Sequence, residues 1–373
     1  MSLSLLETED ETMLRDSARG WLADHAPIAA LRKMRDGGQT FDAGLWREMA
    51  KMGWAGVLAP ESAGGADMGH RAAGILAEEM GFGLTASPFL STAVIAATAL
   101  QGAQEKLAAI AAGEVIYALA VDEATKHAPE RTSLYADRIG NGFRLSGTKV
   151  FVADGSAAAR VLILARTSGA PGEALGLTLF DIDADRIGLS RMPRATVDSR
   201  DHAELRIESV EATGEDVVGD VDNALAVLAP ALRAGQAGIA AEMLGLAGGA
   251  CAMTLGYLKE RKQFDRTIGS FQALQHRAAH LWSEIEVTAS AVAHAGRMLD
   301  TDPIAAEMAV SLAKARASKT ADLAVREGVQ MHGGIGMTDA YDIGFYMKRA
   351  RVAAEWLGDY GYHAARVAAA RGF

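Results

Sequence analysis

Residues 224–260 place the strongest constraint on what this chain can fold into. They are rich in alanine and leucine, a composition that predicts one long and largely apolar helix. Residues 303–329 have the same character, and Pro303 suits a first helical position. Because apolar helices of this length must bury their faces, we expect a helical bundle that also packs against other subunits.

The hydrophobic pattern changes in the middle of the chain from one typical of helices to one typical of strands. Asn141 and Gly142 form a hairpin signal. Short apolar or alternating runs lie on both sides of it, with no helical segment between them. These runs are 115–121, 135–139, 143–145, 150–152, 161–165, 177–182 and 203–207. The pattern predicts a small antiparallel sandwich or barrel.

The first part of the chain is predicted to be helical. Thr8 and Glu11 have the spacing of a capping box, and apolar residues follow at helical intervals. A further helix is expected at 45–52, and another that ends near Gly81. We therefore predict an α+β fold with a helical domain at 1–113, a β domain at 114–217 and a helical bundle at 218–373.

Composition excludes several classes of function. A formal net charge of -10 argues against nucleic acid, and no run approaches the ~20 uninterrupted apolar residues of a membrane helix. The start of the chain, MSLSLLETEDETML, carries acids where a secretory signal carries basic residues. The single cysteine, Cys251, excludes an internal disulfide and fits a reducing cytoplasm, where we place the protein. His276 and His280 have ligand spacing but lack the glutamate of a zinc hydrolase motif, so no metal is expected.

Three cations, Arg261, Lys262 and Arg266, lie where one long helix is expected to end and another to begin. They fit a solvated helix terminus whose charges complement the macrodipole. They also fit a ligand site in which Arg261 contacts a diphosphate, Phe264 covers an aromatic ring and Gln272 binds a polar edge. Spacing alone leaves both interpretations open.

A second segment begins at Gln330 and contains Gly333, Gly334 and Gly336. Glycine after a long helix is usually a C-terminal cap. Three glycines in four positions exceed what one cap needs, and they let the backbone approach a ligand and point its amides at an anion. No strand precedes the segment, so it is not a Rossmann fingerprint.

Together these two segments resemble the acyl-CoA dehydrogenase family. Its last domain carries an arginine-x-x-phenylalanine element and, some seventy residues later, a glutamine-x-x-glycine-glycine element. The resemblance covers nearly the whole chain. GWAGVLAPESAGG, which ends at Gly65, LAEEMG, which ends at Gly81, and GTKVFV, which begins at Gly147, are similar to the family's earlier segments.

The resemblance implies FAD at a subunit interface of a homo- or hetero-oligomer, a dimer or tetramer. One chain supplies Arg261, Gln263, Phe264 and Gln272, and a neighbour adds Gln330, Gly333 and Gly334. Phe151 stands where many members place a tryptophan against the flavin, and Ala153 where they place a threonine. The substrate is an acyl-CoA, which loses a proton and a hydride from adjacent carbons. An electron-transfer flavoprotein or a similar acceptor then takes the electrons.

The sequence departs from the family at the catalytic base. Members carry a glutamate either near the C-terminus, where this chain has Leu357, or at the start of the long helix, where it has Gly235. The family's threonine-glutamate-proline motif is replaced at 121–124. Asp359 is the nearest carboxylate by alignment, and it fits either a helix cap or a displaced base.

The last part of the chain, from Leu357 to Arg366, resembles small subunits of paired dehydrogenases, in which one partner carries the base. Three functions stay open at this level. The first is α,β-dehydrogenation of an acyl-CoA, alone or beside a partner. The second is a non-catalytic subunit that completes a neighbour's FAD site, and the third is a flavin-dependent oxygenase or oxidase on the same fold.

Overall fold

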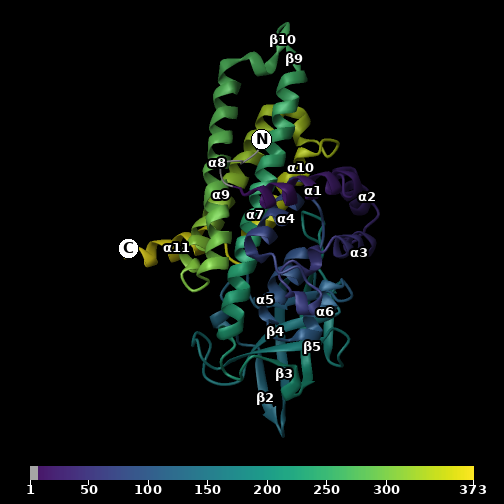
Figure 1. Cartoon of the computed structure of the whole chain (residues 1–373), viewed down its shortest axis with the longest axis vertical. Coiled ribbons are helices and arrows are strands. Elements are labelled where there is room, and N and C mark those ends of the chain that lie inside the picture. Colours follow the sequence, from purple (N-terminus) through teal and green to yellow (C-terminus); the bar gives the residue numbers. More distant parts are fainter. Residues whose placement is uncertain (1–6) are drawn as a thin grey trace. The chain divides into compact units, whose positions relative to one another are not determined.

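A computed structural model describes residues 7–373 of the chain, which form two compact units (Figure 1). Of the described residues, the first unit contains 7–38, His70–Ala86 and Gln236–Phe373. The second contains Gln39–Gly69 and Ser87–Gly235. The three-domain division expected from the sequence remains a prediction, because the two units follow contacts and not the order of the chain.

The first unit is almost entirely helical. Its helices are α1 (Glu9–His25), α2 (Ile28–Asp36), α4 (Gly69–Phe82), most of α7 (Leu225–Glu260), α8 (Gln272–Thr301), α9 (Ala306–His332), α10 (Ile343–Glu355) and α11 (Tyr360–Ala370). Short 3-10 turns are η6 (Ile268–Ser270) and η7 (Gly333–Met337). A two-stranded hairpin, β9 (Lys262–Gln263) with β10 (Arg266–Thr267), joins α7 to α8. That hairpin was not expected, since residues 218–373 were predicted to form a helical bundle.

The start of α1 has the Thr8 half of the predicted capping box. The side-chain oxygen of Thr8 accepts a hydrogen bond from the backbone N–H of Glu11, and acidic residues fill the first turn, where the helix dipole favours them. The Glu11 carboxylate pairs with Arg71 of α4 and Arg297 of α8. The cap therefore also joins three helices of this unit.

Helices α4 and α7 cross with their backbones in contact. A Cβ atom at Gly81 would lie 2.1 Å from the carbonyl oxygen of Glu242, and one at Gly245 would lie 1.8 Å from that of Glu78. Only glycine allows this approach. Just beside the crossing, Glu242 forms a bidentate ion pair with Arg349 of α10, with N–O distances of 2.8 and 2.7 Å and both side chains buried.

The second unit holds the sheet and its covering helices. The helices are α3 (Ala43–Lys51), α5 (Ala97–Ala99), α6 (Gln104–Ala111) and the π-helix η3 (Phe89–Ala96), with 3-10 turns η1 (Trp54–Gly56), η2 (Glu61–Ala63), η4 (Pro129–Arg131) and η5 (Gly214–Asp216). The strands are β1 (Tyr117–Ala120), β2 (Tyr135–Ile139), β3 (Gly142–Ala153), β4 (Arg160–Arg166), β5 (Leu177–Asp183), β6 (Leu189–Pro193), β7 (His202–Ala212) and β8 (Val217–Val218).

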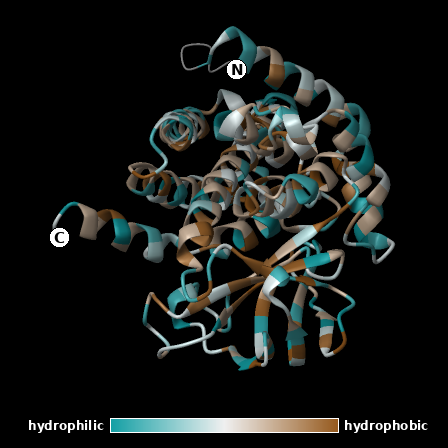
Figure 2. Ribbon diagram, turned by 60° about the horizontal axis from the view of Figure 1, so that its bottom comes forward, coloured by the Kyte–Doolittle hydropathy of each residue, from teal (hydrophilic) through white to brown (hydrophobic). Residues whose placement is uncertain are grey.

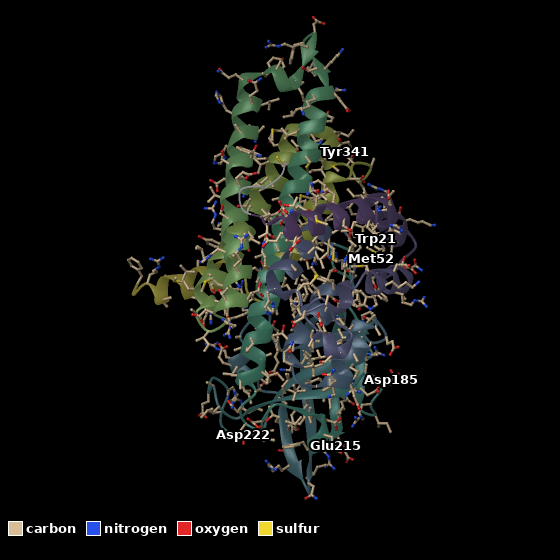
Figure 3. The ribbon with its side chains drawn as sticks, in the orientation of Figure 1. Trp21, Met52, Asp185, Glu215, Asp222 and Tyr341 are labelled. Carbon is tan, nitrogen blue, oxygen red and sulfur yellow. The ribbon has the colours of Figure 1, made fainter. Side chains whose placement is uncertain are left out.

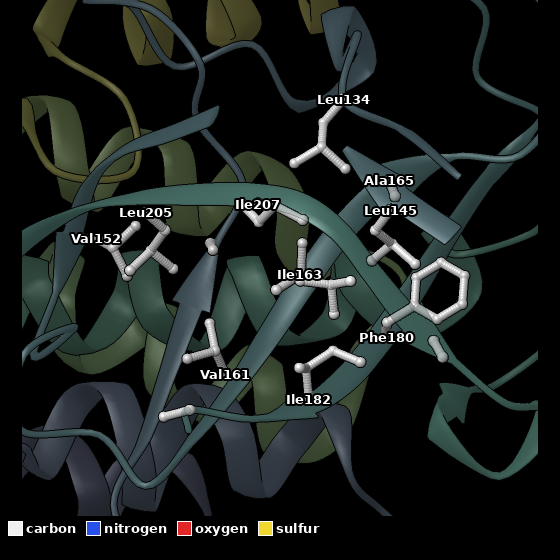
Figure 4. Close-up of a cluster of buried hydrophobic side chains, with 14 of the residues drawn as sticks. Leu134, Leu145, Val152, Val161, Ile163, Ala165, Phe180, Ile182, Leu205 and Ile207 are labelled. Carbon is white, nitrogen blue, oxygen red and sulfur yellow. The ribbon is translucent and has the colours of Figure 1, made fainter. Parts of the chain in front are cut away.

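These strands form one sheet in the order β6-β7-β3-β2-β4-β5-β8, with β1 beside β4. Most pairs are antiparallel, including the predicted hairpin β2–β3, while β4 pairs in parallel with β1 and β2. Hydrophobic residues (brown in Figure 2) concentrate on these strands. Their side chains converge in the cluster of Figure 4, which includes Val161, Ile163 and Ile182. The predicted α+β class, with helical regions flanking an antiparallel-rich sheet, is confirmed.

By length and composition α7 is able to cross a bilayer, and it is the one helix within residues 7–373 of which this is true. However, 78% of its most apolar window is buried inside the protein, as is common for a core helix.

The close crossing of α4 and α7 predicts a large effect of a single methyl group. We expect Gly81→Ala or Gly245→Ala to lower the free energy of unfolding by about 2–4 kcal/mol, because a backbone carbonyl occupies the space of the new Cβ. Gly74→Ala, on the same helix α4, is the control, since its Cβ would meet only the Ala241 side chain at 3.8 Å. Urea denaturation measures all three, and equal stability of Gly81→Ala and Gly74→Ala would refute the close crossing.

Candidate functional site

A short hairpin joins α7 to α8 at their common tip (Figure 1), and it carries the exposed ring of Phe264. Phe264 and Asp265 connect β9 to β10, with φ angles of 53° and 58°. Two successive left-handed residues are typical of a type I′ turn, which favours asparagine and glycine, so Phe264 is held in a conformation that costs free energy. Phe264 is 85% exposed. Its ring meets the Phe271 ring edge-on, with 6.1 Å between the ring centroids. Strain and exposure together indicate a contact with a ligand or another chain.

Arg261 and Gln272 lie on either side of this hairpin. Arg261 follows the last residue of α7, and Gln272 is the first residue of α8. Both are exposed, and neither side chain forms a hydrogen bond or ion pair within residues 7–373. The Gln263 amide donates to the backbone carbonyl of Lys262 at 2.8 Å. The residues predicted to contact the diphosphate and the ring therefore lie on one exposed segment, and within residues 7–373 the Arg261 guanidinium has no partner there.

The glycine segment ends α9 and leaves its backbone uncovered. Gly333 has φ 66° and ψ -142°, a conformation that is almost confined to glycine. It caps α9, as one interpretation expected. Nothing within the described chain lies within 4 Å of a Cβ built on Gly333 or Gly334, and both residues are exposed. Gln330 is exposed as well, so this helix end is open to a ligand in addition to being capped.

An aromatic cluster joins the glycine segment to the arginine segment. The ring of His332, the last residue of α9, packs on Tyr257 of α7 at 4.5 Å and on Tyr341 at 4.7 Å. Tyr341 is labelled in Figure 3. Tyr257 lies one helical turn before Arg261, whose N–H donates to the Tyr257 carbonyl at 2.9 Å. These ring contacts therefore join the glycine segment to the last turn of α7, which precedes Arg261.

Phe151, in the second unit, projects from a bulge in β3. Lys149 pairs with Leu205 and Val152 with Ala203, so two residues of β3 face one residue of β7. Phe151 has φ 53° and is 59% exposed. The bulge turns its ring outward and leaves Ala153 buried. The N–H of Val150 donates to the carbonyl of Asp122 at 2.8 Å, so the bulge adjoins the altered 121–124 segment.

The charged residues beside this bulge hold the loop in place. The Lys149 ammonium is fully buried and donates to Glu123 at 2.8 Å and to the Val121 carbonyl at 3.1 Å. Burial lowers the pKa of Lys149 to about 8. Burial opposes ionisation of Glu123, but Lys149 and bonds from Ser133 and Leu134 lower the pKa of its carboxyl overall. Both charged groups are held by the ion pair and by hydrogen bonds within the loop, so neither is free to take a proton from a substrate.

Leu357, at one of the two base positions, lies in a tightly held turn. It is 2% exposed and has φ 56°. Its carbonyl accepts hydrogen bonds from Gln236 Nε2 and His363 Nε2, both at 3.1 Å. Gln236 directly follows Gly235, the other base position, in the chain. The buried ammonium of Lys314 donates to the carbonyls of Ala353, Ala354 and Gly358 at 3.1, 3.1 and 3.2 Å.

The carboxylates nearest this turn in sequence or space are engaged elsewhere. Asp359 is the N-cap of α11 and accepts the Tyr362 N–H at 2.8 Å, which is the cap role that the sequence allowed. Glu355 is exposed and pairs with Arg351, and buried Glu242 pairs with Arg349. Within residues 7–373 no group of three histidine, cysteine, aspartate or glutamate side chains is placed to hold a metal ion.

Sequence reasoning missed four residues of this region: Gln236, Lys314, His332 and His363. Their polar atoms are buried beside the candidate site, which no local pattern reveals. His332 carried the only available signal, since it stands inside the glycine segment.

Comparisons with known proteins match most of the chain. The model described as "Acyl-CoA dehydrogenase, N-terminal domain" matches residues 8–114, and "Acyl-CoA dehydrogenase, C-terminal domain" matches residues 225–371. The acyl-CoA dehydrogenase IpdE2 of Mycobacterium tuberculosis is 32% identical over 356 residues, which cover 94% of this chain and 93% of the relative.

Two solved structures extend the comparison. A variant of the Tcur3481-Tcur3483 steroid ACAD has a TM-score of 0.86 and 31% identity, with 98% of each chain covered. The ChsE4-ChsE5 complex from Mycobacterium tuberculosis has a TM-score of 0.86 and 25% identity, with 97% of each chain covered.

We predict that the contribution of Lys314 to the free energy of unfolding depends on pH. Burial lowers the pKa of Lys314 to about 7, from 10.5 in an unfolded chain. Between these values the unfolded chain binds the proton and the folded chain does not, so the contribution of Lys314 to the free energy of unfolding rises with pH, by up to about 1.4 kcal/mol per unit. This gain in stability shrinks as the pH falls from 10.5, and it is fully lost once the pH has fallen through about 7. We expect the stability difference between the wild type and Lys314→Met to follow this course in urea titrations, and a difference that stays flat from pH 7 to 10 would contradict it.

Proposed function

This chain belongs to the acyl-CoA dehydrogenase family, and we propose that it takes part in FAD-dependent α,β-dehydrogenation of an acyl-CoA thioester as one subunit of a heteromeric enzyme. Family members are FAD-dependent oxidoreductases that act on CH–CH groups. The observation that carries the heteromeric proposal is the turn at Leu357, where a buried apolar residue, whose carbonyl accepts two hydrogen bonds, stands in place of the base.

The described residues fit a flavin dinucleotide. Arg261, whose guanidinium has no partner within residues 7–373, offers a contact for the diphosphate, and Gly333 and Gly334 offer uncovered backbone to the cofactor that a neighbouring chain holds. Gln263, Gln272 and Gln330 offer exposed amides for polar edges. The exposed rings of Phe264 and Phe151 offer aromatic surfaces, each fixed by a left-handed backbone.

When bound, FAD supplies the acceptor for the hydride that leaves the β-carbon of the thioester. The α-proton needs a carboxylate in a dry pocket, because desolvation raises the basicity of a carboxylate. Leu357 and Gly235 cannot take a proton, and Asp359 is occupied as a cap. We therefore assign the base to a partner chain, with this chain contributing the FAD-binding residues and an apolar wall at Leu357.

Names of two of the matching structures support this assignment. Each names a pair of chains, Tcur3481-Tcur3483 and ChsE4-ChsE5, and the first is named a steroid ACAD. By analogy we propose that the acyl-CoA is bulky. An electron-transfer flavoprotein or a similar carrier is the proposed electron acceptor.

The test compares the chain alone with the chain co-expressed beside a related chain that carries glutamate at the position of Leu357. Bound flavin is measured from the absorbance of the purified protein, and bleaching by acyl-CoA is then followed without oxygen. We expect flavin and bleaching in the complex, with bleaching abolished when the partner's glutamate is changed to glutamine. Asp359→Asn in this chain is the matched change, and we expect it to leave the bleaching rate of the complex within about twofold.

Other outcomes point elsewhere. Bleaching by the chain alone that is lost in Asp359→Asn would make Asp359 the base and contradict the partner assignment. Flavin that is retained but never bleached, with rapid oxygen uptake after chemical reduction, would favour an oxygenase or oxidase. A complex that binds flavin only through the partner's residues would leave this chain a structural subunit.

We expect substitutions of Phe151 to change the free energy of unfolding and the affinity for FAD in different ways. Phe151→Gly relieves a left-handed backbone, so we expect the free energy of unfolding to stay level or rise by about 0.5–1 kcal/mol, while FAD affinity falls because the exposed ring is lost. Phe151→Trp keeps an aromatic face and should retain the affinity. Urea denaturation and equilibrium titration with FAD measure the two effects, and unchanged FAD affinity in Phe151→Gly would remove this residue from the site.

A further inference from the structure

The turn at residues 339–342 follows the glycine segment and leads into α10. From 333 to 340 every residue except Gly336 is exposed. The N–H groups of Thr338 and Tyr341 donate to carbonyls three residues before them, at 3.0 and 3.3 Å, so these bonds close local turns. An exposed segment that is held by bonds of this kind has low local stability of its own. Side-chain contacts with the rest of the first unit therefore decide how well the turn is fixed.

Two arginines of α2, Arg32 and Arg35, bind this turn, and we refer to them as the arginine clamp. Arg35 forms a bidentate ion pair with the Asp339 carboxylate, with N–O distances of 2.7 and 2.9 Å. Arg32 donates to the backbone carbonyl of Asp339 at 2.7 Å and to the Asp342 carboxylate at 2.6 Å. The partners lie 304 to 310 residues apart in the chain. One short helix near the start of the sequence thus holds both ends of the turn.

An aromatic ring fixes the two guanidinium groups of the clamp. Arg32 and Arg35 lie over the ring of Phe345 in α10, with 4.8 and 4.9 Å between the guanidinium carbon and the ring centroid. Phe345 itself is buried. A guanidinium that is stacked and bidentate is better ordered than one in an isolated surface ion pair. Leu31 is the one buried residue of α2, so the arginine contacts, more than core packing, tie this helix to α10.

The charges of the clamp are present at every pH near neutrality. The hydrogen bond from Arg35 lowers the pKa of Asp339 to about 2, and Lys348 of α10 contributes to this shift. A guanidinium stays protonated in proteins. Asp36 also accepts a hydrogen bond from Arg35, at 2.8 Å, which fixes the guanidinium from its own helix. The contact between Arg35 and Asp339 is therefore a permanent ion pair and not a pH switch.

Tyr341 connects the clamped turn to the elements assigned to the cofactor. Its ring packs on His332 at 4.7 Å and meets Tyr257 of α7 edge-on at 6.0 Å. His332 directly precedes Gly333, where the exposed backbone of the glycine segment begins. A displacement of the turn would move Tyr341 and disturb the rings that hold this point. The position of the turn therefore bears on the shape of the glycine segment.

We propose that Arg32 and Arg35 are positioning residues for the cofactor. They act through Asp339 and Asp342, which fix the turn and so keep the glycine segment in one shape before FAD arrives. The assignment rests on the proposed function, since it takes FAD as the ligand. Order of this kind raises affinity, because a segment that is already fixed loses less conformational freedom when the ligand binds.

The experiment compares the wild type with Arg35→Met and Lys33→Met. Lys33 is an exposed cation of the same helix, so its loss is the matched control. Amide hydrogen exchange and calorimetric titration with FAD are measured on the flavin-free full chain, together with its partner chain where the wild type needs one to bind FAD. We expect Arg35→Met, and not Lys33→Met, to speed exchange at 333–342 and to weaken FAD binding about 3–30-fold.

A double variant separates positioning from general stability. Two residues that act through one another lose affinity once, so Arg35→Met combined with Asp339→Asn should bind FAD no more weakly than the weaker of the single variants. Arg35→Lys keeps the charge but lacks the bidentate fork, so we expect it to recover only part of the loss.

Three results would overturn the proposal. One is an FAD affinity of Arg35→Met equal to that of the wild type, and another is additive losses in the double variant. The third is faster exchange throughout the first unit with a lower melting temperature, since Arg35 would then serve stability and not the glycine segment. Failure of the proposed function has a different signature, because the wild type itself would then bind no FAD, alone or with a partner chain, although Arg35→Met still sped exchange at the turn.

Discussion

The backbone contact between α4 and α7 at Gly81 and Gly245 fixes the helix on which the candidate site depends. α7 carries Gln236, which holds the Leu357 turn, and Glu242, which binds Arg349 of α10. Further along it carries Tyr257 against His332, and it ends just before Arg261. A helix held this closely cannot rotate without driving a Cβ or a carbonyl into its neighbour. Its rigidity therefore positions the cofactor elements and the base position together.

Most of this arrangement follows from local patterns in the sequence. The Thr8 cap, the long helix at 224–260 and the Asn141-Gly142 hairpin depend on near neighbours, and the structure has all three. β6, β8 and the tip hairpin were missed because they are short and one of them contains left-handed non-glycine residues. The bulge at Phe151 was also invisible, since it depends on the register of β3 against the distant β7.

The candidate site was predictable to a similar degree. Arg261, Gln272 and Gln330 were found because a motif at fixed spacing marks them, and all three are exposed, with no side-chain partner among residues 7–373. Gln236 and Lys314 were not found because they meet the Leu357 turn from helices far away in the chain, and His363 was not found because no local pattern marks its bond to the Leu357 carbonyl. Their hydrogen bonds satisfy the backbone carbonyls around this turn, so the turn is held without an acidic side chain at position 357.

The central claim is that the flavin-binding residues are intact in this chain while the base is not. The most direct measurement introduces the missing carboxylate: the FAD-loaded chain, without a partner, is mixed anaerobically with acyl-CoA, and the flavin absorbance of the wild type is compared with that of Leu357→Glu. Burial at this position would raise the basicity of the new carboxylate. The account predicts bleaching in Leu357→Glu and none in the wild type. Wild-type protein that bleaches as fast as Leu357→Glu would contradict it.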